Sequence, residues 1–177
     1  MTQALNVSIE SPQSGFMSLR LRAGEQSIVM GASCMPHDSL LELIEALSVL
    51  LESGAAGEAA AAVRWNCEPE EYDFRFTTHG ARVRFTITHH LDQRRTAGAS
   101  RQVFSWMGSE FELCVPFWRE LRDLRRRIAT DVYDQNWRRP FPHQQMRRLT
   151  ELLRGRKREV RQVTRQKVRL DVSREAD

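Results

Sequence analysis

Cysteine is scarce in this 177-residue chain, and no long apolar run is present. Cys34, Cys67 and Cys114 are odd in number and widely spaced, which argues against a disulfide framework and against a C-x-x-C metal site. No apolar stretch approaches the roughly 18 residues that a membrane-spanning helix needs. The N-terminus lacks the basic segment and long apolar core of a secretion signal. We therefore expect a cytoplasmic protein with reduced thiols and no contact with a membrane.

Lysine is also scarce, and the charges are unevenly distributed along the chain. Lys157 and Lys167 are the only lysines among 27 basic residues. Residues 1–118 carry a net charge of −5, whereas residues 119–177 carry a net charge of +9. An asymmetry of this kind makes nucleic acid one candidate partner for the basic last third of the chain.

Alternating apolar residues predict strands through much of the first two thirds of the chain. The pattern places these strands at residues 5–9, 16–21, 28–30, 63–67, 72–76, 83–87, 104–106 and 111–115. Gly24 and the pair His79-Gly80 suit tight turns between neighbouring strands, and Gly108-Ser109 suits a two-residue hairpin. The sequence therefore predicts a series of antiparallel hairpins.

Three segments change to a helical period. Apolar residues of 39–53 fall on one helix face, with Asp38 as the N-cap or Ser39 and Glu42 as a capping box. Pro116 suits the first position of a helix that continues to about residue 137, and Pro142 suits the start of a last helix. The predicted order is βββαβββββαα. We expect an α+β fold with one antiparallel sheet of about seven to eight strands and helices packed on one face.

Two parts of the chain are predicted. Residues 1–153 form a single α+β domain, and residues 154–177 form a basic C-terminal extension. The sparse apolar positions of the extension leave three alternatives, which are a short helix, a late strand and a disordered arm that orders on a partner.

An acidic stretch precedes one predicted strand, in the sequence N-C-E-P-E-E-Y-D-F-R-F at residues 66–76. Alternation sends the aromatic residues of 72–76 to a buried face and Asp73 toward solvent. Catalysis by paired carboxylates, or metal binding, would need these groups to face one point. We interpret residues 68–71 as a charged turn that offers a contact surface to a partner.

The other residues that could take part in catalysis or metal binding give little support for either role. His89 and His90 are adjacent on a predicted strand and should face opposite sides, which disfavours a shared metal ion. Neither a nucleophile elbow nor a glycine-rich phosphate loop is present. We predict no metal, cofactor or catalytic site. An enzyme with an unrecognised site would need a pocket that gathers Cys67 and Glu71 with one of the two histidines.

Two stretches together resemble a class of small, uncharacterised bacterial α+β proteins of the toxin-immunity type. Residues 33–51 give a polar helix start and a Leu-rich helix, and residues 63–76 give an aromatic strand that runs into E-P-x-E-Y. The resemblance covers about a third of the chain and implies binding to a toxin without catalysis. The basic extension departs from it, because proteins that neutralise nucleases are more often acidic.

We arrive at two main hypotheses. The first is a non-enzymatic protein-binding module, an immunity or inhibitor protein that neutralises a bacterial toxin. Its predicted contact residues are Glu68, Glu70, Glu71, Asp73, Arg94, Arg95 and Arg101. The alternative is a nucleic-acid-associated accessory protein that uses the basic extension. Its predicted contacts are Arg154, Arg156, Lys157, Arg158, Arg161, Arg165, Lys167 and Arg169. The oligomeric state stays open in both.

Overall fold

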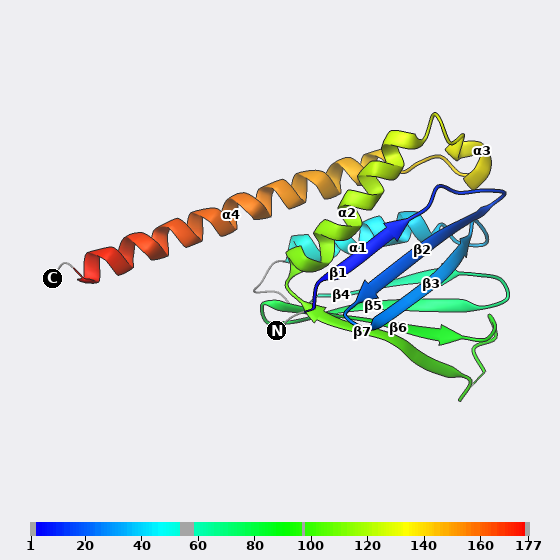
Figure 1. The fold of residues 1–177 in the computed structure, drawn as a ribbon, viewed down its shortest axis with the longest axis horizontal. Helices are drawn as coiled ribbons and strands as arrows, with labels where there is room; N and C mark the ends of the chain where they lie inside the picture. The colour runs from blue at the N-terminus through cyan, green and yellow to red at the C-terminus, as the bar shows by residue number, and fades with distance from the viewer. Residues whose placement is uncertain (1–2, 54–58, 97, 176–177) are drawn as a thin grey trace.

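The computed structural model describes residues 3–53, 59–96 and 98–175, except for the side chains of Arg161 and residues 163–175. These residues form strands and helices in the following order (Figure 1): β1 (Leu5–Ile9), β2 (Phe16–Ala23), β3 (Gln26–Ser33), α1 (Ser39–Ser53), β4 (Ala60–Asn66), β5 (Glu71–His79), β6 (Arg82–His90), β7 (Ser100–Gly108), α2 (Glu110–Arg127), α3 (Tyr133–Trp137) and α4 (His143–Glu175). The α+β class is as predicted.

The strands form two antiparallel sheets. β1, β2 and β3 make one sheet in that order, and β4 to β7 make a second sheet in sequence order. The tight turns at Gly24 and Gly80 are confirmed, and both glycines have positive φ. The expectation of one sheet of seven to eight strands was wrong. Alternation shows which side of a strand is buried, but it does not show which strands pair, and α1 separates β3 from β4.

Strand β3 connects the two sheets at both of its ends. At its start, the side chain of Gln26 exchanges hydrogen bonds of 3.3 and 3.2 Å with the backbone of Ser105 in β7. At its end, the hydroxyl of Ser33 donates to the carboxylate of Glu68, just after β4, at 3.1 Å. These side-chain bonds join the sheets at points where the strands do not share a backbone ladder.

Helix α1 matches its prediction closely. The backbone N–H of Leu41 donates to Asp38 Oδ1 at 3.2 Å, which confirms Asp38 as a capping residue. The predicted apolar face is buried against β4 and α4. Its members are Leu40, Leu43, Ile44, Leu47, Leu50 and Leu51. Each such side chain stabilises the fold by roughly 1.5–3 kcal/mol relative to an exposed one.

Helix α2 begins at Glu110, so the strand predicted at 111–115 and the hairpin at Gly108-Ser109 were wrong. Ser109 is the N-cap, and it forms a reciprocal capping box with Glu112. Pro116 therefore lies inside the helix instead of opening it. The helix predicted as far as residue 137 divides into α2 and α3, because Val132 before α3 adopts a left-handed backbone conformation.

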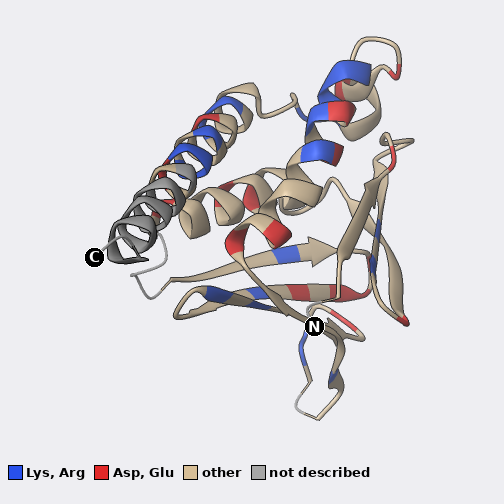
Figure 2. Ribbon diagram, turned by 60° about the vertical axis from the view of Figure 1, so that its left-hand side comes forward, with Lys and Arg blue, Asp and Glu red and all other residues tan. Residues whose placement is uncertain are grey.

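The helices gather on one side of the molecule and the strands on the other (Figure 2). The core between them combines apolar side chains of both sheets with those of α1 and α2. Phe74, Phe76 and Trp65 of the four-stranded sheet are fully buried, whereas Tyr72 is partly exposed at the sheet end. The predicted burial of Phe74 and Phe76 is thus confirmed. Basic residues are dense on α2 and α4, on the helical side, and others lie along the strands (Figure 2).

Helix α4 begins directly after Pro142, as predicted, and buries Met146, Leu149 and Leu153. It continues without a break through residue 154 and away from the body (Figure 1). Of the three alternatives for the extension, the structure shows a helix. No helix in the described part of the chain is both long and apolar enough to span a membrane.

Candidate functional site

The acidic stretch forms a tight turn at one end of the four-stranded sheet. The backbone N–H of Cys67 donates to the carbonyl of Glu70 at 2.8 Å and closes the turn. β5 then starts at Glu71, which pairs with His90 across the ladder, and the next pair is Tyr72 with His89. The register therefore brings two histidines from a distant part of the sequence beside the acidic turn.

Arg95 joins two of the carboxylates. Its guanidinium donates to Glu71 Oε2 from Nε at 3.1 Å and from Nη2 at 3.0 Å. It also donates to both oxygens of Asp73, at 2.8 and 2.7 Å. The hydrogen bonds to Asp73, and then those to Glu71, raise the pKa of Arg95 against the opposing effect of burial. We call Glu70, Glu71, Asp73, His89, His90 and Arg95 the Arg95 cluster.

A turn in the β6–β7 connection positions Arg95. The carboxylate of Asp92 accepts hydrogen bonds from the backbone N–H groups of Arg94 and Arg95, at 2.9 and 3.2 Å. The side-chain amide of Gln93 donates to Asn66 Oδ1 at 3.3 Å and ties this turn to the end of β4. The sequence predicted an exposed loop here, and Asp92 before two arginines was the signal for a side-chain-capped turn.

The two histidines contact different carboxylates. His90 Nε2 lies 3.2 Å from Asp73 Oδ2, and His89 Nε2 lies 3.1 Å from Glu70 Oε2. The ring of His89 also stacks on Tyr72, with ring centres 4.7 Å apart. Burial and the nearby Glu70 raise the pKa of Tyr72, so its hydroxyl stays protonated and donates to that carboxylate at 3.4 Å.

The structure thus brings together part of the predicted contact set. Glu71 and Asp73 lie inside the Arg95 cluster, and the Glu71 side chain is only 5% exposed. Glu70 is half-exposed at the edge of the cluster, and the exposed Glu68 lies near it in the turn. Arg94 and Arg101 are exposed and have no ion pair among the described residues.

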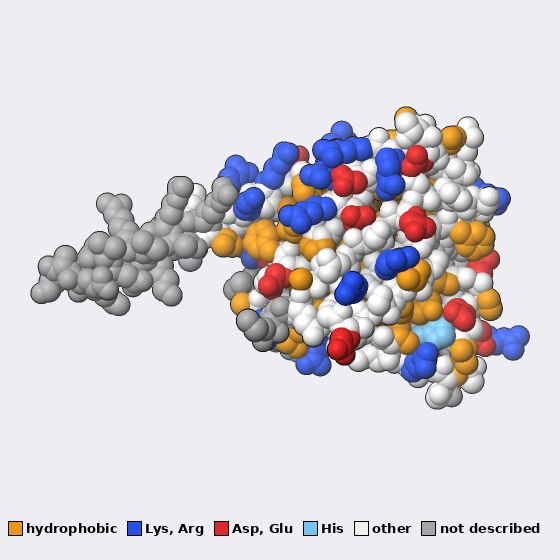
Figure 3. All heavy atoms as spheres, in the orientation of Figure 1, with side chains coloured by type: hydrophobic (Ala, Val, Ile, Leu, Met, Phe, Trp, Pro, Cys, Tyr) orange, Lys and Arg blue, Asp and Glu red, His pale blue; other side chains and the backbone are white. Residues whose placement is uncertain are grey.

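The predicted nucleic-acid contacts lie along α4, at the far end of the body. Arg156 donates to Glu110 at 3.1 Å and to Glu159 at 2.6 Å, so it is engaged in ion pairs. Arg154, Lys157 and Arg158 are exposed. Figure 3 shows basic side chains over α2 and the first part of α4. The side chains of the last four predicted contacts, at positions 161, 165, 167 and 169, lie outside the described residues.

Cys67 lies beside the acidic turn, but its chemistry does not favour nucleophilic attack. Burial, followed by the negative charges of Glu70 and Glu71, raises the pKa of the thiol to about 12. The thiol therefore stays protonated at neutral pH, whereas a nucleophilic cysteine needs a lowered pKa. In the described part of the chain, no three His, Cys, Asp or Glu residues are grouped as metal ligands.

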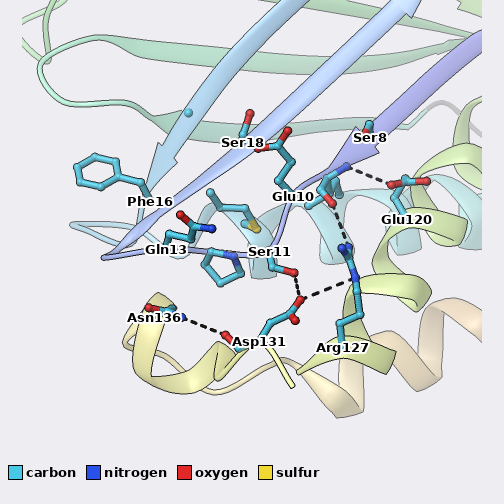
Figure 4. A pocket seen from close by; sticks show the side chains of 14 residues that line it. Ser8, Glu10, Ser11, Gln13, Phe16, Ser18, Glu120, Arg127, Asp131 and Asn136 are labelled. Atoms are coloured by element: carbon cyan, nitrogen blue, oxygen red, sulfur yellow. Dashed lines mark hydrogen bonds and ion pairs between the residues drawn. The ribbon is translucent and has the colours of Figure 1, made fainter. Parts of the chain in front are cut away.

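A second candidate is a polar cleft of about 850 Å³ between the β1–β2 connection and the end of α2 (Figure 4). Glu120 accepts the backbone N–H of Ile9 at 3.2 Å, and Arg127 donates to the Ile9 carbonyl at 3.3 Å. Asp131 accepts from the hydroxyl of Ser11 and lies 4.0 Å from Arg127 Nε. These side chains are already used to hold the connection against α2. Sequence reasoning missed the cleft because its residues come from distant segments.

Comparison of the chain with models of protein families, with curated proteins and with solved structures finds no match. The Arg95 cluster and the polar cleft are therefore interpreted from their own geometry. Of the two, the cluster has exposed arginines beside it, Arg94 and Arg101, that form no ion pair among the described residues.

Proposed function

We propose that this protein is a non-enzymatic protein-binding module that acts by binding and blocking another protein. The observation that carries the proposal is the Arg95 cluster, in which Arg95 holds the carboxylates of Glu71 and Asp73 and the two histidines of β6 lie beside Asp73 and Glu70. A contact surface of this kind needs fixed charges and shape rather than a reactive group.

The fixed geometry lowers the cost of binding. Side chains that are already immobilised lose less conformational entropy when a partner docks. Glu68 and Glu70 at the turn, with Arg94 and Arg101 nearby, present both signs of charge to solvent. Complementary charges at the rim of an interface favour one partner and one orientation, and like charges repel wrong partners. The cluster supports selective recognition of a protein surface.

The finer proposal is an immunity protein that neutralises a bacterial toxin in the cytoplasm. It rests on the resemblance of residues 33–51 and 63–76 to proteins of the toxin-immunity type. Residues 33–51 supply β3's end and α1, and residues 63–76 supply β4, the acidic turn and the start of β5. Ser33, at the start of the first segment, donates to Glu68 in the second, so the two segments meet next to the cluster.

The proposal is tested by affinity capture from the native cell with the tagged full-length chain. One variant combines Glu68→Arg with Glu70→Arg, and its control combines Glu25→Arg with Glu45→Arg, which are exposed sites elsewhere. We expect one protein partner to be retained by the wild type and the control, and to fall about tenfold with the cluster variant. Equal retention by all three, or no selectively retained protein, would contradict the proposal.

A second candidate function is a nucleic-acid-associated role for α4. The observation that favours it is that Arg154, Lys157 and Arg158 are exposed on one continuous helix that extends from the body (Figure 1). Binding would weaken steeply with salt and would be lost when residues 154–177 are deleted. An electrophoretic shift of RNA or DNA at low salt measures this. Absence of a shift by the full-length chain at low salt would rule it out.

A further inference from the structure

A groove of about 510 Å³ lies between α2 and α4, where α4 leaves the body. Its apolar lining comes from Phe111, Val115 and Trp118 on α2 and from Leu153 and Val160 on α4. Figure 3 shows hydrophobic side chains gathered at this place, with basic side chains beside them. The basic members of the lining are Arg119, Arg154 and Lys157.

Contacts between the two helices fix the shape of the groove. The indole N–H of Trp118 donates to the hydroxyl of Thr150 at 3.0 Å, so the ring is held across the helix interface. Arg122 lies over the same ring, 4.8 Å from its centre. At the other end, Arg156 pairs with Glu110 at 3.1 Å and joins the start of α2 to α4. The groove is therefore preformed.

The charge of the groove has one sign. Arg119, Arg154 and Lys157 have no ion pair with any described carboxylate. Glu110 at the start of α2 and Glu159 on α4 are both paired with Arg156. An apolar floor with unneutralised cations at its edge is complementary to a ligand with an apolar face and negative flanks.

The spacing of the floor fits a helix. Positions 111, 115 and 118 follow one another by four and three residues, so they project from one face of α2. The seven residues from Phe111 to Trp118 span about 10 Å at 1.5 Å per residue, which is about two helical turns. A partner helix with apolar residues at i, i+3, i+4 and i+7 would present matching side chains to this floor.

We propose that the α2–α4 groove docks an acidic amphipathic α-helix of another protein. This surface goes beyond the proposed function of the Arg95 cluster, because groove and cluster lie at opposite ends of the body (Figure 1). A second copy of this chain is a poorer occupant. Its exposed helix α4 is basic over 154–158, so it would meet the basic rim with charge of the same sign.

The probe is a synthetic fluorescein-labelled helical peptide with Leu at i, i+3, i+4 and i+7 and Glu at the flanking positions. Fluorescence anisotropy measures its binding to the full-length chain. Val115→Glu places a charge on the floor, and Arg154→Glu combined with Lys157→Glu reverses two rim charges. We expect each variant to weaken binding by about tenfold or more. The double variant changes exposed residues only, so it tests the groove even if Val115→Glu destabilises the fold.

The matched control combines Arg20→Glu with Arg22→Glu on the exposed face of β2, which changes net charge equally. It should bind the peptide within about twofold of the wild type. A peptide of the same composition with scrambled order should bind at least about tenfold more weakly. Equal binding of the scrambled peptide, or equal weakening by the control variant, would overturn the proposal. Laurate, a fatty acid with an apolar chain and a negative head group, is added as a competitor. The proposal is also overturned if laurate displaces the peptide and the order of the peptide's residues makes no difference to binding.

Discussion

The guanidinium of Arg95 separates two carboxylates that would otherwise face each other in a partly buried site. Glu71 and Asp73 both accept from it, and Glu71 is nearly enclosed. Arg95→Met keeps much of the aliphatic stem and removes the charge, so two negative groups lose their partner. We expect the free energy of unfolding to fall by about 1–3 kcal/mol at neutral pH, measured by urea denaturation.

Neighbouring substitutions separate charge pairing from general damage. Arg94→Met changes an exposed residue of the same turn and should alter stability by less than about 0.5 kcal/mol. Combining Arg95→Met with Glu71→Gln removes one of the two carboxylates left without a partner. The double variant should therefore recover part of the lost free energy of unfolding. If Arg95→Met were as mild as Arg94→Met, the cluster would not hold its side chains in place.

The thiol of Cys67 gives the protein a sensitivity to alkaline pH. Its pKa is raised to about 12 in the fold, whereas an unfolded cysteine has a pKa near 8.5. Between these values the unfolded chain loses the proton and the folded chain keeps it. Stability contributed by this difference is therefore present below about pH 8.5 and is lost as pH rises. Burial raises the pKa of Cys114 and Tyr133 in the same direction.

We expect the urea midpoint to fall between pH 8 and pH 10.5, with a shallower fall in Cys67→Ala. Each group contributes at most about 1.4 kcal/mol per pH unit to the slope. The comparison of slopes, rather than of midpoints, removes the constant cost of deleting the side chain. Parallel slopes for the wild type and Cys67→Ala would show that the folded thiol titrates normally.

At the level of elements, the start of α2 is set by one capping box. The Ser109 hydroxyl accepts from the backbone N–H of Glu112 at 3.3 Å, and the Glu112 carboxylate accepts from the Ser109 N–H at 2.7 Å. Ser109→Ala should cost about 1 kcal/mol in the free energy of unfolding, measured by thermal or urea denaturation. Ser27→Ala, at an exposed strand position, is the control and should change stability little. Equal effects would mean that the cap is not formed in solution.

The same element shows how far the sequence could predict the fold. Helix α1 was predictable because Asp38, the Leu-rich face and the helical period agree. For α2 the signals conflict, since Phe111, Leu113 and Val115 alternate like a strand while S-x-x-E at 109–112 marks a helix start. The segment forms a helix, as the capping box indicates, because a helix buries both Leu113 and Phe117 on its inner face.

The candidate sites were less predictable than the elements. Glu71, Asp73 and Arg95 were all among the predicted contact residues. The sequence did not show that Arg95 pairs with the two carboxylates, because it lies more than twenty positions away in a loop. The pairing of β5 with β6 and the capping of the next turn by Asp92 bring it there. The α2–α4 groove depends on how two helices cross, which periodicity alone does not determine.

At the scale of the whole molecule, the charge asymmetry becomes a separation in space. The acidic turn lies at one end of the four-stranded sheet, and the exposed basic residues of α4 lie at the other end of the body (Figures 1 and 2). The two surfaces therefore lie at opposite ends of the body. A partner that meets one of them leaves the other accessible, so the two proposed interactions are testable independently.

The relation of α4 to the body can be tested by truncation. Met146, Leu149 and Leu153 are buried, whereas the helix beyond residue 160 runs away from the body (Figure 1). The free energy of unfolding of a chain that ends at Val160, measured in urea, should therefore lie within about 0.5 kcal/mol of that of the full-length protein. Leu149→Ala should lower the free energy of unfolding by about 2–5 kcal/mol, because it leaves a cavity in the core. A truncation as damaging as Leu149→Ala would mean that the end of α4, beyond Val160, packs on the body.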